Sequence, residues 1–192
     1  MTMKTNIQAK ERNNNNVREL VLTGMFTAVI CVMSQLSIPI QPIPFTLSLF
    51  AIFLTGALLT PRSAFLATLT YLLLGAFGLP VFAGLKGGIQ VLTGMTGGYL
   101  IAYPVMALLI SVFYKYFRKY NKLLSLTVGM IVALTFCYTF GTLWFTFITD
   151  TPFYTALTLC VFPFLLFDLA KIVFAIIVSI IIRKTVFTHY NL

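Results

Sequence analysis

The sequence is poor in charge, and poorest in acids. Of its 192 residues only four are Asp or Glu, while Lys and Arg together number 13. Charged residues make up 9% of the chain, against about 25% in an average soluble domain. No charged residue lies between Glu19 and Arg62 or between Lys122 and Asp150. Runs of this length argue against a soluble globular domain and indicate helices that span a membrane, at about 20 residues each.

The residues that catalysis and metal binding require are also scarce. The one histidine, His189, lies in a polar C-terminal tail, and the patterns H-E-x-x-H and G-x-S-x-G are absent. Cys31, Cys137 and Cys160 are far apart within apolar runs, which favours buried thiols over a disulfide or a metal site. The phosphate-binding pattern G-x-x-x-x-G-K-[ST] is missing as well. These absences argue against an enzyme and predict neither a cofactor nor a metal ion.

Proline and glycine divide the apolar sequence into six segments. The expected membrane-spanning segments are residues 20–38, 46–60, 63–78, 99–117, 123–149 and 153–182. The second and third are short, about 22 Å at 1.5 Å per residue, and the sixth is long enough to kink at Pro163. Three prolines predict an extended connector at 39–45, and seven glycines make 78–98 the most irregular stretch. The predicted fold class is an all-α integral membrane protein, a six-transmembrane-helix bundle.

Basic residues are distributed unevenly between the two sides of such a bundle. Eleven of the 13 lie in the N-terminal segment, the second and fourth connectors and the tail, which share one side. This asymmetry predicts a plasma-membrane protein with both termini cytoplasmic, in contact with membrane lipid and not with nucleic acid. The expected parts are a polar cytoplasmic segment, disordered or interfacial in composition, a single six-helix membrane domain and a cytoplasmic tail: residues 1–19, 20–184 and 185–192.

Two charged residues interrupt the last apolar segment. Asp168 and Lys171 are three residues apart, so a helix places them on one face. A charge near the bilayer centre costs about 2.5–3.5 kcal/mol on insertion scales and is tolerated where it is paired or bound inside a bundle. The pair is therefore either a structural ion pair or part of a ligand site. Arg183 marks the predicted cytoplasmic edge about 22 Å further along, which places Asp168 in the outer half of the membrane.

An outward-facing pocket is therefore expected around the pair. One acid and one base suit a single small solute with a polar end and an apolar body better than they suit a channel or an ion-driven pump. Asp168 can accept hydrogen bonds from ligand N–H groups, and Lys171 or Lys86 can meet a carboxylate or a carbonyl. Lys86 lies in the glycine-rich stretch, which is either a flexible loop or a lid. The expected aromatic walls are Phe45, Phe82 and Tyr99.

Four stretches carry a resemblance to a known family. They are IPIQPIPFTLS at 38–48, GLPVFAG at 78–84, GMTGGYL at 94–100 and FDLAK at 167–171. Over residues 20–184 the chain resembles the biotin-specific S component of energy-coupling factor transporters, the BioY family. The resemblance implies a six-helix subunit that captures biotin from outside. It also implies three partner subunits, a transmembrane T component and two cytoplasmic ABC-type ATPases.

The resemblance also implies roles for individual residues. Asp168 and Lys171 match the D-x-x-K motif of the family and are the first candidates for ligand contacts. The other implied contacts come from its P-x-T-L and GGY motifs: Thr46, Gly97, Gly98 and Tyr99. Ser48 and Met95 depart from the family, in which glutamine and proline are usual.

A small-residue step on the first segment is a candidate docking face. Gly24 and Ala28 let another helix approach closely, either within the bundle or from a partner. The resemblance favours the T component. The alternative function is a self-sufficient secondary transporter of a small carboxylated solute, or a membrane enzyme of lipid metabolism. An inverted repeat would favour the transporter, and the sequence shows no convincing one. A membrane enzyme should show more polar catalytic residues at the interface.

Overall fold

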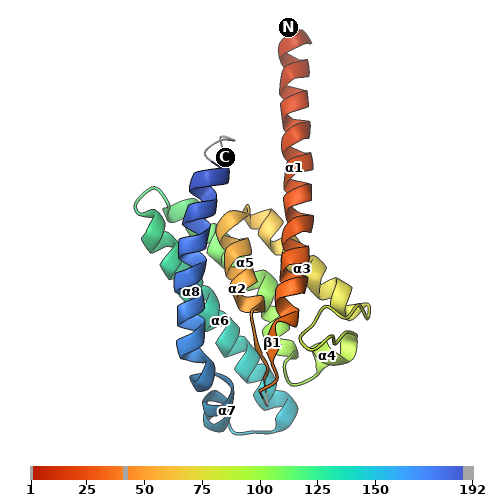
Figure 1. Ribbon diagram of the computed structural model, residues 1–192, viewed down its shortest axis with the longest axis vertical. Helices are drawn as coiled ribbons and strands as arrows, with labels where there is room; N and C mark the ends of the chain where they lie inside the picture. The colour runs from red at the N-terminus through yellow and green to blue at the C-terminus, as the bar shows by residue number, and fades with distance from the viewer. Residues whose placement is uncertain (1, 41–42, 188–192) are drawn as a thin grey trace.

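The computed structural model describes residues 2–40 and 43–187, with side chains for 16–40 and 43–185, and is almost entirely helical (Figure 1). Within these ranges the α-helices are α1 (Thr2–Gln35), α2 (Ser48–Leu58), α3 (Pro61–Ala76), α4 (Ile89–Thr93), α5 (Gly97–Phe117), α6 (Lys122–Thr149), α7 (Phe153–Cys160) and α8 (Phe162–Ile182). A π-helical turn, η1 (Arg183–Phe187), follows α8. Two short strands, β1 (Ser37–Ile38) and β2 (Phe45–Thr46), pair antiparallel. The all-α prediction is confirmed.

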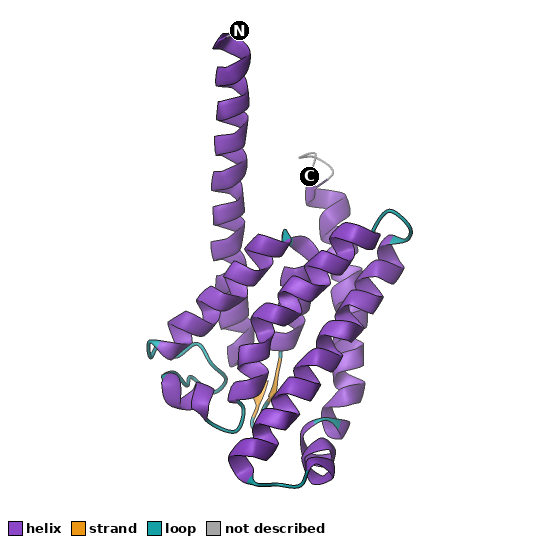
Figure 2. Ribbon diagram, turned by 180° about the vertical axis from the view of Figure 1, so that it is seen from behind, coloured by secondary structure: helices purple, strands orange, loops and turns teal. Residues whose placement is uncertain are grey.

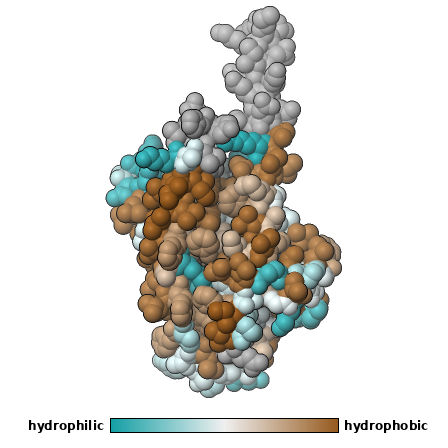
Figure 3. Space-filling view, in the orientation of Figure 1, coloured by the Kyte–Doolittle hydropathy of each residue, from teal (hydrophilic) through white to brown (hydrophobic). Residues whose placement is uncertain are grey.

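Four of the described helices are long and apolar enough to cross a membrane. Their apolar parts are Asn16–Gln35, Gly97–Phe117, Lys122–Thr149 and Phe162–Thr185. On the face that Figure 3 shows, apolar side chains cover much of the bundle, and strongly hydrophilic residues lie at the end at which α8 finishes and over the α4 region. Helices α2 and α3 are shorter, about 16 and 24 Å at 1.5 Å per residue. The count of six spans therefore depends on these two helices and stays a prediction.

Helix α1 is longer than the first predicted span. No proline or glycine lies between Thr2 and Gly24 to stop a helix, and α1 runs through the polar residues and projects beyond the bundle (Figure 1). The structure therefore has a helix where composition indicated a disordered or interfacial segment. Residues 41–42 of the predicted connector and 188–192 of the predicted tail, with His189, lie outside the described residues.

The proline-rich connector enters the bundle as a narrow hairpin, whose two strands lie between the helices in Figure 2. Ser37 pairs with Thr46, and Ile38 pairs with Phe45. Extended backbone of this kind is tolerated at membrane depth where protein surrounds it. Because the hairpin is not helical, it leaves a carbonyl group near the bundle centre that a side chain can bind.

Helix α5 is at the centre of the fold. It packs against α2, α3 and α6, while α8 packs against α2 and α6. The α5–α6 contact is close because two glycines face large rings across it. A Cβ atom at Gly141 would overlap the ring of Tyr99, and one at Gly98 would overlap the side chain of Trp144. A larger residue at either position would push the two helices apart.

The sixth predicted segment forms two helices. α7 ends at Cys160 and α8 begins at Phe162, so the predicted kink at Pro163 is a break. Pro163 lies in the first turn of α8, where its missing N–H costs no helical hydrogen bond. The start of α8, with α4, α7 and the hairpin, lies at the end of the bundle opposite to the point where α8 finishes (Figure 1). Asp168 and Lys171, early in α8, belong to that half.

Candidate functional site

Asp168 and Lys171 form a buried ion pair on one face of α8, as their spacing predicts. Lys171 Nζ lies 2.7 Å from Asp168 Oδ1. Lys171 is 7% exposed and Asp168 is 1% exposed. Removing both charges from water costs free energy, which their attraction offsets only when further hydrogen bonds satisfy the remaining polar atoms. The surroundings of each residue supply those bonds.

Lys171 connects α8 to the hairpin. Its Nζ donates to the Thr46 carbonyl at 2.8 Å and lies 3.9 Å from the centroid of the Phe45 ring, a cation–π contact. The same ring packs on α8, with its centroid 6.4 Å from that of Phe164 and 5.4 Å from that of Phe167. The ammonium group and the aromatic rings together fix strand β2 against α8.

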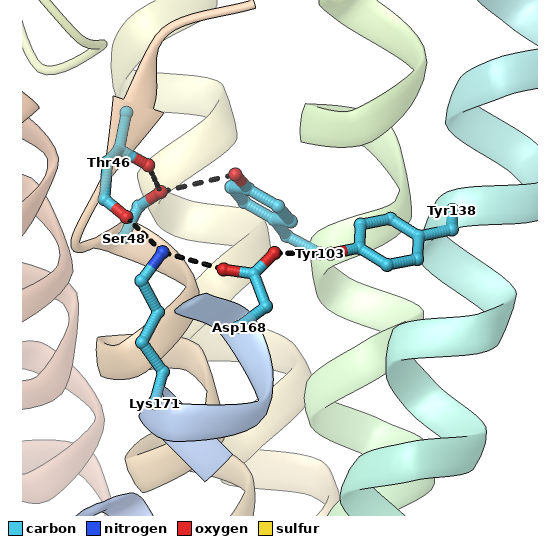
Figure 4. A network of polar contacts seen from close by, with 6 residues as sticks. All are labelled: Thr46, Ser48, Tyr103, Tyr138, Asp168 and Lys171. Atoms are coloured by element: carbon cyan, nitrogen blue, oxygen red, sulfur yellow. Dashed lines mark hydrogen bonds and ion pairs between the residues drawn. The ribbon is translucent and has the colours of Figure 1, made fainter. Parts of the chain in front are cut away.

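Asp168 belongs to a polar network that reaches α5 and α6 (Figure 4). Tyr138 of α6 donates to its Oδ2 at 2.5 Å. Thr46, whose carbonyl binds Lys171, extends the network toward α5. Its hydroxyl lies 2.5 Å from that of Ser48, and the Ser48 hydroxyl lies 3.2 Å from Tyr103 Oη on α5. The site is thus assembled from four parts of the chain that are distant in sequence.

The two tyrosines of this network were missed by the sequence interpretation. Tyr103 and Tyr138 each lie in the middle of an apolar span, and a buried tyrosine usually finds a hydrogen-bond partner for its hydroxyl. A tyrosine in the middle of an apolar span is the sequence feature that could have identified both residues. Cys137 and Cys160 also line the site, as free thiols.

Two adjoining cavities flank the network. The smaller one has a volume of about 50 Å³ and contains Asp168 and Lys171 in its wall. The larger one, about 380 Å³, extends beneath the glycine-rich stretch and reaches Lys86 and Gln90. Five residues line both cavities: Ile43, Pro44, Thr46, Tyr99 and Tyr103. We call the two together the cleft; the larger part alone falls within the usual range for small-molecule sites, about 300–1,000 Å³.

The predicted walls of the pocket all line the cleft. Phe45 lines the smaller cavity, Phe82 and Lys86 line the larger one, and Tyr99 lines both. Phe82 is also a core residue, 1% exposed, whose ring meets that of Tyr71 edge-on at 5.5 Å between centroids. Lys86 is exposed and has no ion pair within the described residues. The cleft therefore presents one paired and one unpaired ammonium group.

Gly97 and Gly98 are placed beside the cleft and do not line it. A Cβ atom at Gly97 would overlap the carbonyl oxygen of Leu92, and one at Gly98 would overlap Trp144. Trp144 in turn donates from Nε1 to the Gly94 carbonyl at 3.0 Å. The two glycines therefore pack α5 closely against its neighbours, which positions Tyr99 at the cleft.

Gln35, at the end of α1, fastens the glycine-rich stretch over the cleft. Its Nε2 donates to the carbonyls of Pro80 and Phe82, each at 3.2 Å, and its Oε1 accepts from the Leu85 N–H at 3.0 Å. Gly84, next to that amide, has a φ of +71°, a conformation that glycine adopts without strain. Of the two interpretations of this stretch, the fastened loop favours a lid.

Gly24 and Ala28 lie on an exposed face of α1. They line a shallow groove between α1 and α3 together with Val32 and Leu74. A Cβ atom at Gly24 would meet nothing within 4 Å. Because packing within the bundle does not require a small residue there, the structure favours the docking interpretation over the intramolecular one.

Comparison with known proteins agrees with this architecture. The pattern of the BioY family matches residues 3–188. "Biotin transporter BioY" of Thermotoga maritima is 39% identical over 168 residues, 88% of this chain and 97% of that protein. "Probable biotin transporter BioY" of Pyrococcus horikoshii is 36% identical over 162 residues, 84% of this chain and 94% of that protein.

A solved structure shares the fold. It is a crystal structure of the "S-component for biotin from an ECF-type ABC transporter", with a TM-score of 0.84 and 28% sequence identity. The similarity covers 90% of this chain and 94% of that chain. Since the family pattern and the curated relatives both extend over most of the sequence, the chain belongs to the BioY family.

Proposed function

We propose that the chain is the substrate-capture subunit of an ATP-driven vitamin transporter of the energy-coupling factor type, and that it binds biotin. Its relatives at 36–39% identity are named as biotin transporters, and the solved structure that it resembles is named as an S-component for biotin. For the same reason its activity is transport and not enzymatic catalysis. The cleft supplies the binding site that such a subunit needs.

The observation that carries the proposal is the buried Asp168–Lys171 pair in the wall of the cleft. Biotin has a cyclic urea with two N–H groups and a carbonyl, an apolar ring and chain, and a terminal carboxylate. The carboxylate of Asp168 is an acceptor for the urea N–H groups, and Lys171 or Lys86 meets the carbonyl or the carboxylate. Phe45, Phe82 and Tyr99 contact the apolar body.

The proposed cleft opens toward the outside of the cell. Its lining includes the hairpin and the early part of α8, which lie in the half of the bundle away from the end at which α8 finishes (Figure 1). The distribution of basic residues favours a cytoplasmic location for that end and for both termini. A solute captured in the outer half then needs a partner to move it inward.

The proposed partners are a transmembrane T component and two ABC-type ATPases. The sequence has no phosphate-binding loop, so energy must come from outside this chain. The groove at Gly24 and Ala28 is the proposed docking face for the T component, because helices in a membrane associate through close packing of small residues.

Calorimetric titration of the purified chain tests the proposal. Biotin is expected to bind saturably, with one molecule per chain, and thiamine, a cationic vitamin without a carboxylate, is expected not to bind. A correctly folded chain that gives no heat with biotin would contradict the proposed substrate.

A further inference from the structure

A cavity of about 340 Å³ lies at the end of the bundle where α8 finishes, between α1, the α2–α3 turn, α5 and α8. We call it the basic cavity, because four cationic side chains line it against one acid, Glu19. The four are Arg18, Lys115, Arg118 and Arg183. We propose that the basic cavity binds the phosphate group of an anionic phospholipid. This inference does not depend on which solute the cleft captures.

The cationic wall is built into the fold through Arg183. Its Nε donates to the Ala57 carbonyl at 3.1 Å, and its guanidinium carbon lies 4.1 Å from the centroid of the Tyr114 ring. Arg118 approaches the same ring, at 5.9 Å. Arginine keeps its charge at any physiological pH and presents several donors in a plane that matches phosphate oxygens. Two guanidinium groups are thus held beside one half-enclosed space by contact with the same buried ring.

The start of α3 adds positive potential. Thr60 is the N-cap of this helix and Pro61 lies in its first turn, and both residues line the cavity. Pro61 has no N–H and the Ser63 N–H donates to the Thr60 hydroxyl, so the helix contributes the positive end of its dipole, which favours an anion. The carboxylate of Glu19 accepts a hydrogen bond at its Oε2 from the Ser63 hydroxyl, at 3.4 Å. Among the described residues that line the cavity, four are cationic and one is acidic, so the charge of its wall favours a phosphate.

The lining favours a lipid over a soluble anion. Besides the cations, three leucines line the cavity, Leu22, Leu58 and Leu59, whose apolar surface a free phosphate could not use. Strongly hydrophilic residues give way to apolar side chains at this end of the bundle (Figure 3). A phospholipid places its phosphate at that boundary and its acyl chains against apolar surface. The basic residues also predict this side to be cytoplasmic, where anionic lipids are concentrated.

The test compares two double variants with the same loss of charge at the same end of the protein. Lys115→Gln with Arg118→Gln removes two exposed cations that line the basic cavity, whereas Lys119→Gln with Lys122→Gln removes two that do not. Each protein is purified from bilayers of phosphatidylcholine with phosphatidylglycerol, and the phosphatidylglycerol retained per chain is measured by native mass spectrometry. The first variant is expected to bind phosphatidylglycerol at least tenfold more weakly than wild type, about 1.4 kcal/mol, and the second about as tightly as wild type.

Three results would overturn the proposal. Equal losses of phosphatidylglycerol binding in the two variants would mean that surface charge in general attracts the lipid. Binding of inorganic phosphate in pure phosphatidylcholine as tight as that of phosphatidylglycerol would assign the site to a soluble anion. Unchanged lipid retention with loss of T-component co-purification in the first variant would assign it to a protein contact. An unchanged unfolding temperature shows that both variants are folded.

Discussion

At the scale of single residues, Tyr138 is the least expected part of the site. Its hydroxyl donates to Asp168 Oδ2 at 2.5 Å while Lys171 holds Oδ1, so the carboxylate is oriented from both sides. A hydrogen bond to a charged group contributes about 1.5–3 kcal/mol, part of which positions the carboxylate for a ligand.

We therefore expect Tyr138→Phe to weaken biotin binding about fivefold or more, because the phenyl ring keeps the shape but frees Asp168 to turn. Titration calorimetry on the purified variant measures this. Tyr154→Phe is the control, since Tyr154 is 83% exposed on α7. Equal affinity for Tyr138→Phe and wild type would show that the ion pair alone orients the carboxylate.

The sequence identifies some site residues and not others for a physical reason. A charge in an apolar run is costly wherever it lies, so Asp168 and Lys171 stand out in the sequence itself. A tyrosine in a membrane helix is favourable at the interface, in the core or in a cleft, so Tyr103 and Tyr138 do not. Gly97 and Gly98 share a motif with Tyr99, and only the three-dimensional contacts show that the glycines pack against Leu92 and Trp144 while Tyr99 lines the cleft.

At the scale of elements, the site combines side chains from the regular helices α5, α6 and α8 with the irregular hairpin and glycine-rich stretch. The expected spans at 99–117 and 123–149 correspond closely to α5 and α6, because long apolar runs have one stable form in a membrane. Lys171 of α8 binds the Thr46 carbonyl of the hairpin, whereas the backbone of Val161 at the break bonds to residues of α7 and α8 themselves. The prolines in the local sequence indicate that these segments are irregular, but they do not determine the geometry that each segment adopts.

The glycine-rich stretch is the element whose movement we can test. If residues 84–92 close over the ligand, their amide hydrogens should exchange more slowly with solvent when biotin is bound. Gln35→Ala removes three hydrogen bonds to this stretch and should abolish most of that protection. Hydrogen-exchange mass spectrometry measures the protection by biotin in wild type and in Gln35→Ala. Gln8→Ala, on the part of α1 that projects beyond the bundle, should leave the protection intact. If biotin had no effect on the exchange of residues 84–92 in wild type, the glycine-rich stretch would not be a lid.

At the scale of the whole molecule, the cleft, the basic cavity and the α1 groove are separate surfaces. Gly24 and Ala28 line the groove and neither lines the cleft. Capture of the solute and assembly with partners should therefore be separable by mutation, which a self-sufficient transporter would not require.

Ala28→Trp should fill the groove by steric overlap, so that a partner helix can no longer pack closely. We expect biotin binding to the isolated chain to stay within about twofold of wild type while co-purification with the T component is lost. Ala170→Trp, on an exposed face of α8, is the matched control and should retain both. Loss of biotin binding in Ala28→Trp would place this residue in the bundle core, and retained assembly would place the docking face on another helix.

The central claim is that the buried pair on α8 binds biotin, and Asp168→Asn tests it most directly. The amide keeps the shape of the side chain but removes the charge that attracts ligand N–H groups and balances Lys171. Calorimetric titration should show biotin binding at least tenfold weaker than wild type, about 1.4 kcal/mol. Asp150→Asn, at the end of α6 and outside the cleft, should bind as wild type does. Unchanged affinity in a folded Asp168→Asn protein would contradict the claim and leave the pair with a purely structural role.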